Sequence, residues 1–388
     1  MNVLILGINR NYVNPYTEIV LKILDYTCNC YFFGPGYVTR NELENGIDNY
    51  VERIDNIDLL VTDSMIFEYS LYSNQKYAYR NAGISCSLDD IYRYGQSLEN
   101  YFRKSALKKI LIANWDYYAT PKEHITYLKE NKDCYVISYV DYKSFYSIRD
   151  TKRNGNSFIS NIDSEYPEKN DNWYNFITEN KNRVISLPNS FYCFNYKFFS
   201  SLDKRIRLDI PGFPYLERRI TRELYNPKER RRHQYYELMF FGEKFVRRLS
   251  PKRSVLWGDL QSLRLFKRLY QNTITWTSGA VTRTPIAKYF EIPAAGSVLV
   301  CQSFGGMKEL GFNHGTNCIQ TESKEELARV LATTTPEDLK IISRLGQQMV
   351  LKNHSILARS RQFEKVLEGL KENSFKGSYW SRGKYIVL

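Results

Sequence analysis

A lysine and a glutamate three residues apart are the pair in this sequence that is best placed to do chemistry. Lys288 and Glu291 lie in the segment TPIAKYFEIPAAG, and a spacing of three puts both side chains on one face of a helix. Thr284 is a good helix cap, and Pro285 fits the first helical position, where its missing N–H costs nothing. Helix N-termini attract phosphate, and a carboxylate on the same element can hold sugar hydroxyls. The pair therefore predicts a site for a phosphorylated sugar compound.

The end of the same helix leads into a core strand. Gly296 is predicted to end the helix, and the apolar run at residues 297–301 follows as a buried strand. Pro293 removes one backbone hydrogen bond, so we expect the helix to end or bend about one turn before Gly296. A lysine–glutamate pair at this spacing is more often a surface salt bridge that contributes little. The glycine-terminated helix and strand around it favour ligand binding instead.

Strands alternate with helical segments along the first half, which implies βαβ units and a parallel sheet. The predicted strands are residues 1–7, 57–64, 108–116, 134–141 and 183–190. The pattern restarts in the second half, with strands predicted at 205–212, 254–260, 272–278, 297–301 and 317–320. The sequence thus predicts an α/β protein with two Rossmann-like domains facing across a cleft, because open α/β sheets bind ligands beyond the carboxyl ends of their strands. We assign them to residues 1–200 and 201–370, followed by a tail at 371–388 for which two alternatives stay open, packing back on the first domain and mobility.

Three caps mark the last helices of the chain. Ser323 and Glu326 form a capping box before a helix that reaches Leu331. Thr335 precedes a proline and begins a helix that ends at about residue 352, and Ser355 caps a last helix to about residue 370.

Composition limits the function classes. The seven cysteines are odd in number and include no CxxC pair, which argues for a reducing compartment and against a disulfide framework or a zinc site. Cys28 and Cys30 form a CxC pair, which is read as two strand residues on one face. We see neither a signal peptide nor an apolar run of about 18 residues, so we expect a cytoplasmic protein without a spanning helix.

Positive charge is concentrated in the second half of the chain. Residues 1–200 carry a net charge of −2 and residues 201–388 carry +15, of the total of +13. The second half is therefore the half expected to meet anions, and the options are a nucleotide diphosphate, an anionic membrane surface or a nucleic acid. The basic run KERRRH at 228–233 is read as a solvated surface, and no nucleic-acid module accompanies it.

An ordered series of motifs in the second half resembles the carboxyl-terminal domain of GT-B glycosyltransferases. It comprises KYFEIPAAGSVLVC, GFNHGTNCI, EELARVL and GQQMVLKNHSILARSRQFEKVLEGL, and it covers residues 205–370. The closest likeness is to the group-1 branch that includes spore-maturation-protein-like transferases. The family positions are Lys288, Glu291, Gly296, Phe312, Gly315, Asn317, His354, Ser355 and Arg359.

This resemblance implies a nucleotide-sugar donor held by the second domain and an acceptor held by the first. Glu291 would bind ribose or sugar hydroxyls, Lys288 would face the diphosphate, and Gly296 would allow close helix–strand packing. Gly212 would let the backbone approach the phosphates. The full set of donor-binding residues is Gly212, Arg218, Arg219, Ser278, Arg283, Lys288, Glu291, Gly296, His314 and Asn317. Neither a metal nor a cofactor is expected, because cations and helix N-termini can stabilise a departing diphosphate.

The chain departs from the family pattern at one position that matters for stereochemistry. Retaining relatives carry a glutamate eight residues before the position of Glu291, where this chain has Arg283, so retention and inversion both stay open. An inverting transfer needs a base for the acceptor hydroxyl, and the first domain should supply it. Asp116 and Asp141, which follow predicted strands, are the candidate general bases, and Asp63 and His124 are weaker ones. His354 is read as a capping or packing residue.

The leading interpretation is a glycosyltransferase that acts on a glycan or a lipid-linked acceptor in cell-surface polysaccharide synthesis. Its basic half would also attract it to the inner face of an anionic membrane. One alternative is a nucleotide-sugar epimerase on the same fold, another is a non-catalytic scaffold of that fold, and a third, from a different class, is a basic nucleic-acid-binding protein. No specific nucleic acid is expected as a partner under the leading interpretation.

Overall fold

The fold is taken from a computed structural model of the chain. It describes residues 1–9, 15–71, 88–113, 122–140, 166–191, 205–210, 267–277, 285–303 and 305–388. The strand expected at 254–260 and the cap expected at Thr284 lie outside these ranges.

The first sheet has six parallel strands in the order β2-β1-β3-β4-β5-β6. The strands are β1 Asn2–Leu6, β2 Asn29–Phe33, β3 Leu59–Asp63, β4 Lys108–Ile112, β5 Cys134–Ser138 and β6 Val184–Ser186. Each is short and apolar, and β1, β3, β4 and β6 are buried almost throughout, as parallel strands covered on both faces must be. The chain leaves β1 towards β2 and then returns to the other side of β1 at β3, so the strand order reverses between β1 and β3.

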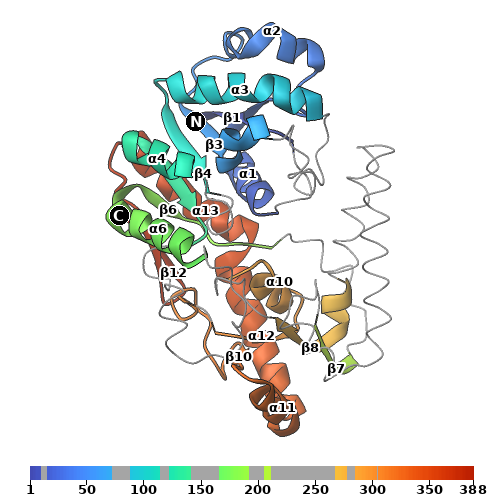
Figure 1. The fold of residues 1–388 in the computed structure, drawn as a ribbon. Coiled ribbons are helices and arrows are strands. Elements are labelled where there is room, and N and C mark those ends of the chain that lie inside the picture. The colour runs from blue at the N-terminus through green and yellow to red at the C-terminus, as the bar shows by residue number, and fades with distance from the viewer. Residues whose placement is uncertain are drawn as a thin grey trace.

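Helices cover both faces of this sheet (Figure 1). They are α1 Pro15–Thr27, α2 Arg40–Val51, η1 Ser64–Leu71, α3 Leu88–Lys104, α4 Lys122–Glu130, α6 Tyr166–Glu179 and the short η3 Lys181–Arg183. One core forms between the sheet and α3, α4 and α6, around residues such as Phe102 and Trp173. The core on the opposite face joins α1 to a helix from the end of the chain, through residues such as Ile23 and Phe363.

The second sheet has four parallel strands in the order β10-β9-β8-β7. They are β7 Arg205–Asp209, β8 Asn272–Thr277, β9 Val298–Cys301 and β10 Ile319–Gln320. The α/β class with two parallel sheets is therefore confirmed. A buried ion pair anchors the edge strand β7, where Arg268 Nε donates to Asp209 Oδ2 at 2.6 Å and a second guanidinium nitrogen donates to Oδ1. Such a two-pronged contact keeps both charges satisfied inside the domain.

Helix α10, which carries the lysine–glutamate pair, spans Lys288–Ala294. The expected start at Pro285 is therefore three residues too early. The bonds from Tyr289 N–H to Ile286 O and from Phe290 N–H to Ala287 O are one residue tighter than α-helical bonds, so the chain enters the helix through a narrow turn.

The helix continues through Pro293 and ends at Ala294, whereas we expected an end or a bend about one turn before Gly296. Gly296 closes the end of the helix, as the sequence predicted. It has φ +67°, its N–H donates to Pro293 O, and Ser297 N–H donates to Ile292 O. These two bonds form a Schellman motif, which satisfies the last carbonyls of the helix. Pro293 has no N–H to donate to Tyr289 O, so one α-helical hydrogen bond is missing there.

The last helices are α11 Lys324–Thr333, α12 Pro336–His354 and α13 Ile356–Lys371, close to the predicted ranges. Thr335 caps α12 in a complete capping box, and Ser355 Oγ accepts from Ala358 N–H at the start of α13. The box expected at Ser323 is only half formed. Ser323 accepts from Glu326 N–H, but the Glu326 carboxylate accepts from Glu322 N–H at 2.6 Å instead of from Ser323 N–H.

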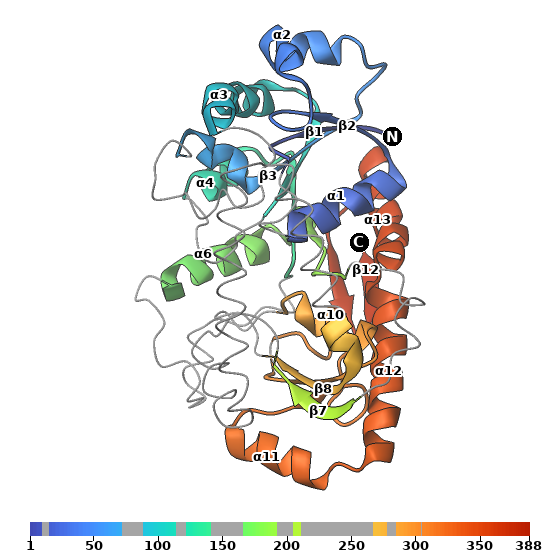
Figure 2. The ribbon, with the colours of Figure 1, turned by 90° about the vertical axis from the view of Figure 1, so that its right-hand side faces the viewer.

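Helices α12 and α13 lie end to end and span both domains (Figures 1 and 2). Helix α12 packs against α10 and β9, whereas α13 packs against α1 of the first domain. The tail then forms a hairpin of β11 Ser378–Ser381 and β12 Lys384–Val387. Its Ser378 Oγ accepts from Ser186 N–H in β6 at 2.9 Å, while Gly383 N–H donates to Glu309 O of the second domain at 2.7 Å. Among the residues that the structure describes, no helix is long and apolar enough to cross a membrane.

Candidate functional site

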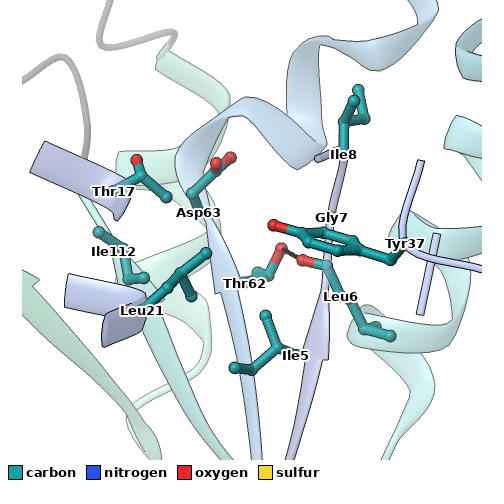
Figure 3. A pocket seen from close by; sticks show the side chains of 10 residues that line it. All are labelled: Ile5, Leu6, Gly7, Ile8, Thr17, Leu21, Tyr37, Thr62, Asp63 and Ile112. Atoms are coloured by element: carbon teal, nitrogen blue, oxygen red, sulfur yellow. Dashed lines mark hydrogen bonds between the residues drawn. The ribbon is translucent and has the colours of Figure 1, made fainter. Parts of the chain in front are cut away.

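A pocket opens at the point of the first sheet where the strand order reverses. It is a small hollow, open to solvent, beyond the carboxyl ends of β1, β3 and β4. Its lining is Ile5, Leu6, Gly7, Ile8, Thr17, Leu21, Tyr37, Thr62, Asp63 and Ile112 (Figure 3). A crevice at such a reversal is where open α/β sheets bind their ligands.

Asp63 is the charged group of this pocket. It is the last residue of β3, it is 6% exposed, and its Oδ1 accepts from Met65 N–H at 2.9 Å. That bond begins η1 and fixes the direction of the carboxylate, because a short side chain can cap the turn that follows it. Figure 3 shows the carboxylate between Thr17 and Tyr37, above the apolar floor. A fixed carboxylate among hydroxyl groups can hold or deprotonate a hydroxyl of a ligand.

The wall opposite Asp63 is built by the loops that follow β1 and β2. Gly7 N–H donates to Phe33 O, and Tyr37 N–H donates to Gly34 O. The backbone at Gly34 has φ +139°, and a Cβ there would lie 2.0 Å from Gly7 O, so only glycine allows the two loops to approach. The Tyr37 ring also packs against Phe32 at 5.0 Å. This packing holds an aromatic ring at the pocket rim.

Lys288 and Glu291 lie in the first turn of α10, on one side of the helix. Both are half-buried. Burial raises the pKa of the Glu291 carboxyl above its ordinary value, and the nearby Lys288 ammonium opposes this effect. Helix α10 follows β8 in the chain, so its first turn lies on the carboxyl side of the second sheet, and in both ribbon views α10 lies between that sheet and the first domain (Figures 1 and 2). The pair can offer a cation and a carboxylate to a ligand held there.

A second group of polar residues lies at the carboxyl ends of β9 and β10. Tyr289 of α10 donates its hydroxyl to Gln302 O at 3.0 Å, and Ser303 N–H donates to Glu322 Oε1 at 2.8 Å. Gln302 is 4% exposed, and its amide nitrogen has no hydrogen-bond partner among the residues that the structure describes. A buried amide donor without a partner is costly, so this edge of the sheet is suited to a polar ligand or an ordered water.

Two predicted donor-binding residues use their polar atoms within their own loop. Asn317 Oδ1 accepts from Asn313 N–H at 2.7 Å, its Nδ2 donates to Gly311 O at 2.8 Å, and His314 Nδ1 accepts from Gln320 N–H at 2.9 Å. The residues from His314 to Asn317 come directly before β10 and therefore lie at its amino end. The structure does not bring them together with Lys288 and Glu291. Gly296 lies at the amino end of β9, where it ends α10.

Several predicted site residues lie outside the residues that the structure describes. They are the candidate bases Asp116 and Asp141 and the donor-binding residues Gly212, Arg218, Arg219, Ser278 and Arg283.

His124, a weaker candidate base, is enclosed by the first domain. It is 1% exposed, burial lowers its pKa to about 3, and its ring lies 6.0 Å from that of Trp173. It stays neutral at physiological pH. In the described ranges, no three His, Cys, Asp or Glu side chains are grouped so that they could hold a metal ion.

The family comparison concerns the second domain. Residues 216–365 match the family model described as Glycosyl transferase-like. This match confirms the resemblance carried by the ordered motifs, and it covers most of residues 205–370. The comparison with curated proteins found no match.

Solved structures of glycosyltransferases are similar over nearly the whole chain. HepE of Anabaena, in complex with UDP and glucose, aligns with a TM-score of 0.48 and 11% identity, covering 95% of this chain and 100% of that one. A glycosyltransferase of Rickettsia africae aligns with a TM-score of 0.45 and 12% identity, covering 96% and 99%. An alpha-glucosyltransferase in complex with UDP aligns with a TM-score of 0.45 and 9% identity, covering 96% and 100%.

Sequence reasoning did not find the pocket of the first domain as a site. Asp63 was only a weaker candidate base, Gly7 was only the end of a predicted strand, and Tyr37 and Thr17 were not singled out. The signal that could have joined them is the apolar run at residues 30–33, which forms β2 and makes the order reverse at β1.

Proposed function

We propose that this protein is a glycosyltransferase that moves a sugar from a nucleotide-sugar donor to a hydroxyl of an acceptor. The observation that carries this proposal is the glycosyl transferase-like match over residues 216–365, within which Lys288 and Glu291 share the first turn of α10. In this proposal Glu291 accepts hydrogen bonds from ribose or sugar hydroxyls, and Lys288 lies against the diphosphate. Positive charge at the leaving group stabilises the transition state of the transfer.

The pocket of the first domain is the proposed acceptor site. Tyr37 offers a ring face, Thr17 offers a hydroxyl, and Asp63 offers a fixed carboxylate above an apolar floor. Sugars are recognised by such a combination of aromatic and polar groups. We therefore propose Asp63 as the base that takes the proton of the acceptor hydroxyl, beside the undescribed Asp116 and Asp141. A hydroxyl-binding pocket on a domain other than that of α10 favours transfer over isomerisation of the donor.

The acceptor class, location and metal requirement extend the same proposal. A glycan or lipid-linked acceptor in cell-surface polysaccharide synthesis is consistent with a protein whose second half carries a net charge of +15, since an anionic inner membrane surface attracts such a half. The transfer needs no metal in this proposal, because Lys288 and the other basic residues of residues 201–388 supply the positive charge. Sedimentation with anionic and with neutral vesicles tests the membrane contact.

The experiment that tests the function has two stages. The first is a thermal-shift screen with UDP-, GDP-, CMP- and dTDP-sugars, in which the correct donor raises Tm because it binds the folded state. The second incubates that donor with glycan and polyprenyl-phosphate-linked acceptors, with and without EDTA, and follows the labelled sugar. We expect transfer of the sugar to an acceptor, and we expect this activity to persist in the presence of EDTA. Conversion of the donor to another sugar nucleotide would favour an epimerase, donor binding without turnover would favour a scaffold, and no binding of any nucleotide sugar would refute the proposal.

A further inference from the structure

The two passages of the chain between the domains meet at one joint. Helix α12 of the second domain ends at His354, and Ser355 caps α13, which packs on the first domain. The segment that leaves β6 passes the same point: Phe191 forms a bridge with Ser355, and Ser190 Oγ donates to His354 O. Any change in the angle between the domains must therefore alter the surroundings of residues 354 and 355.

A buried histidine and a buried arginine form the centre of this joint. Both have no exposed surface. Arg359 Nη2 donates to His354 Nδ1 at 2.8 Å, and the guanidinium carbon lies 4.3 Å from the ring centre of Trp380 in the tail hairpin. Arginine is always a donor, so His354 Nδ1 accepts and its Nε2 carries the proton, which is donated to Leu310 O at 2.8 Å. These bonds join α12, α13, the hairpin and the loop after β9.

The charge states of the two side chains support this assignment. Burial, followed by the neighbouring Arg359 cation, lowers the pKa of His354 well below its ordinary value, so the imidazole stays neutral. Burial also lowers the pKa of Arg359, to about 9, which still leaves the guanidinium charged at neutral pH. Its described partners are neutral groups, namely an imidazole, an indole face and oxygens of Asn189 and Gln362. A buried cation held in this way is a costly means of joining two domains, since apolar packing of equal volume commonly stabilises as well or better.

The joint extends directly to the helix that carries the lysine–glutamate pair. Arg359 Nη2 donates to Asn189 O at 3.5 Å, and Asn189 Nδ2 donates to Pro285 O at 3.1 Å, in the turn that leads into α10. On the other side, the ring of Phe290 lies 5.0 Å from that of His354. Pro285 comes three residues before Lys288, and Phe290 comes directly before Glu291. Contacts from the joint thus bracket the pair.

We propose that His354 and Arg359 are positioning residues that hold α10 at a fixed angle to the first domain, with Asn189 as the link, and thereby align Lys288 and Glu291 with the donor. This role rests on the proposed function of the pair. Directional hydrogen bonds and ring stacking allow one arrangement, whereas apolar contacts tolerate sliding, so a polar joint sets an angle that an apolar joint would not. A misplaced binding group loses affinity without any change of its own chemistry.

Two variants with matched controls separate positioning from general stability. Arg359→Lys keeps the charge but loses the planar fork and its stacking. Its control is Arg183→Lys in the first domain, where a 5% exposed arginine likewise donates to neutral partners, including Asn131 O at 2.8 Å, and lies 5.3 Å from the ring centre of Phe176. Asn189→Ala cuts the link to Pro285 and leaves the joint intact. Its control is Asn131→Ala, which removes a similar bond to a backbone oxygen.

Hydrogen–deuterium exchange of the peptide at 285–296 reads the position of α10 without any ligand. We expect faster exchange there in Arg359→Lys and Asn189→Ala, but not in the two controls at an equal loss of Tm. Calorimetric titration with UDP is then expected to show about 10-fold weaker binding for Arg359→Lys and about 3-fold for Asn189→Ala, because each loses bonds of ordinary strength. The control variants should bind UDP as the unaltered protein does.

The outcomes separate this inference from the proposed function. The positioning role is overturned if exchange at 285–296 is unchanged in Asn189→Ala. It is also overturned if exchange in that variant rises equally across the whole chain. Both outcomes can be read even if Arg359→Lys fails to fold. Exchange that rises locally while UDP affinity stays the same would also overturn it. If the unaltered protein binds neither UDP nor any nucleotide sugar, the proposed function fails, and the exchange result still decides whether the joint holds α10.

Discussion

Replacing Glu291 with glutamine should change stability and donor binding in opposite directions. The substitution keeps the shape of a half-buried side chain in the first turn of α10 and removes its charge. Burial raises the pKa of this carboxyl above the ordinary 4.5, so the folded protein holds the proton more tightly than the unfolded chain does. The stability contributed by this group is therefore lost as pH rises from about 4.5 through the folded pKa. At neutral pH the glutamine variant should have an equal or higher Tm.

The effect on donor binding follows from the lost charge. Hydrogen bonds to a charged group contribute about 1.5–3 kcal/mol, which corresponds to about 10- to 160-fold in dissociation constant. Glutamine retains one oxygen acceptor, so the lower part of this range is expected if one ribose hydroxyl is bound, and the upper part if two are bound. Donor binding should therefore weaken by at least about 10-fold.

Calorimetric titration and thermal unfolding of the same samples provide the assay. The matched control is Glu309→Gln in the second domain. The Glu309 carboxylate accepts from Arg382 N–H of the tail hairpin, and it does not belong to the α10 pair. That variant should lose a little stability and keep its donor affinity. If Glu291→Gln instead lowers Tm and leaves the dissociation constant unchanged, Glu291 supports the helix and the reasoning about the site is wrong.

The other predictions concern the same two sites. Lys288→Gln should weaken donor binding about 10-fold through the lost contact to the diphosphate, with Lys308→Gln as the exposed control, and equal affinities in both variants would remove Lys288 from the site. Donor affinity should fall as the pH is lowered through the raised pKa of Glu291, above 4.5, whereas the glutamine variant should show a flatter titration curve. Asp63→Asn should lower kcat about 100-fold or more and leave donor affinity unchanged, because asparagine still accepts the Met65 bond but cannot take a proton. Asp58→Asn is its control. An unaltered kcat in Asp63→Asn would mean that Asp63 is not the base and that another carboxylate takes the proton.

The elements with local signals could be predicted from the sequence. Apart from β2, the strands of both sheets were recognised from short apolar runs. The caps at Thr335 and Ser355 lie where the pattern put them, because a cap depends on residues three positions apart. Errors arose where a distant contact decides the local structure. Pro285 looks like a first helical residue, yet its carbonyl is held by Asn189 and the helix begins later.

The two sites differ in how far the sequence could reveal them. Lys288 and Glu291 are three residues apart, so a helical period is enough to pair them. The pocket of the first domain joins Gly7, Tyr37 and Asp63, and only the order of the strands brings these residues together. No spacing rule connects three loops of a sheet whose order is unknown.

The interdomain joint, like the pocket, could not be predicted from sequence spacing. Under the proposed function, it would also connect the two sites mechanically. His354 could be read as a packing residue from its place at a helix end, but the partners of Arg359 are Asn189 and Trp380, which are distant in the chain. Transfer requires the donor helix and the acceptor pocket, which lie on different sheets, to be held in register. Within the described residues, the chain passes between the two domains in the stretch after β6 and at the turn at Ser355, and both passages lie at this joint. Under the proposed function, the joint would therefore set the angle between the two sites without contacting either substrate, and its directional hydrogen bonds would allow only one such angle.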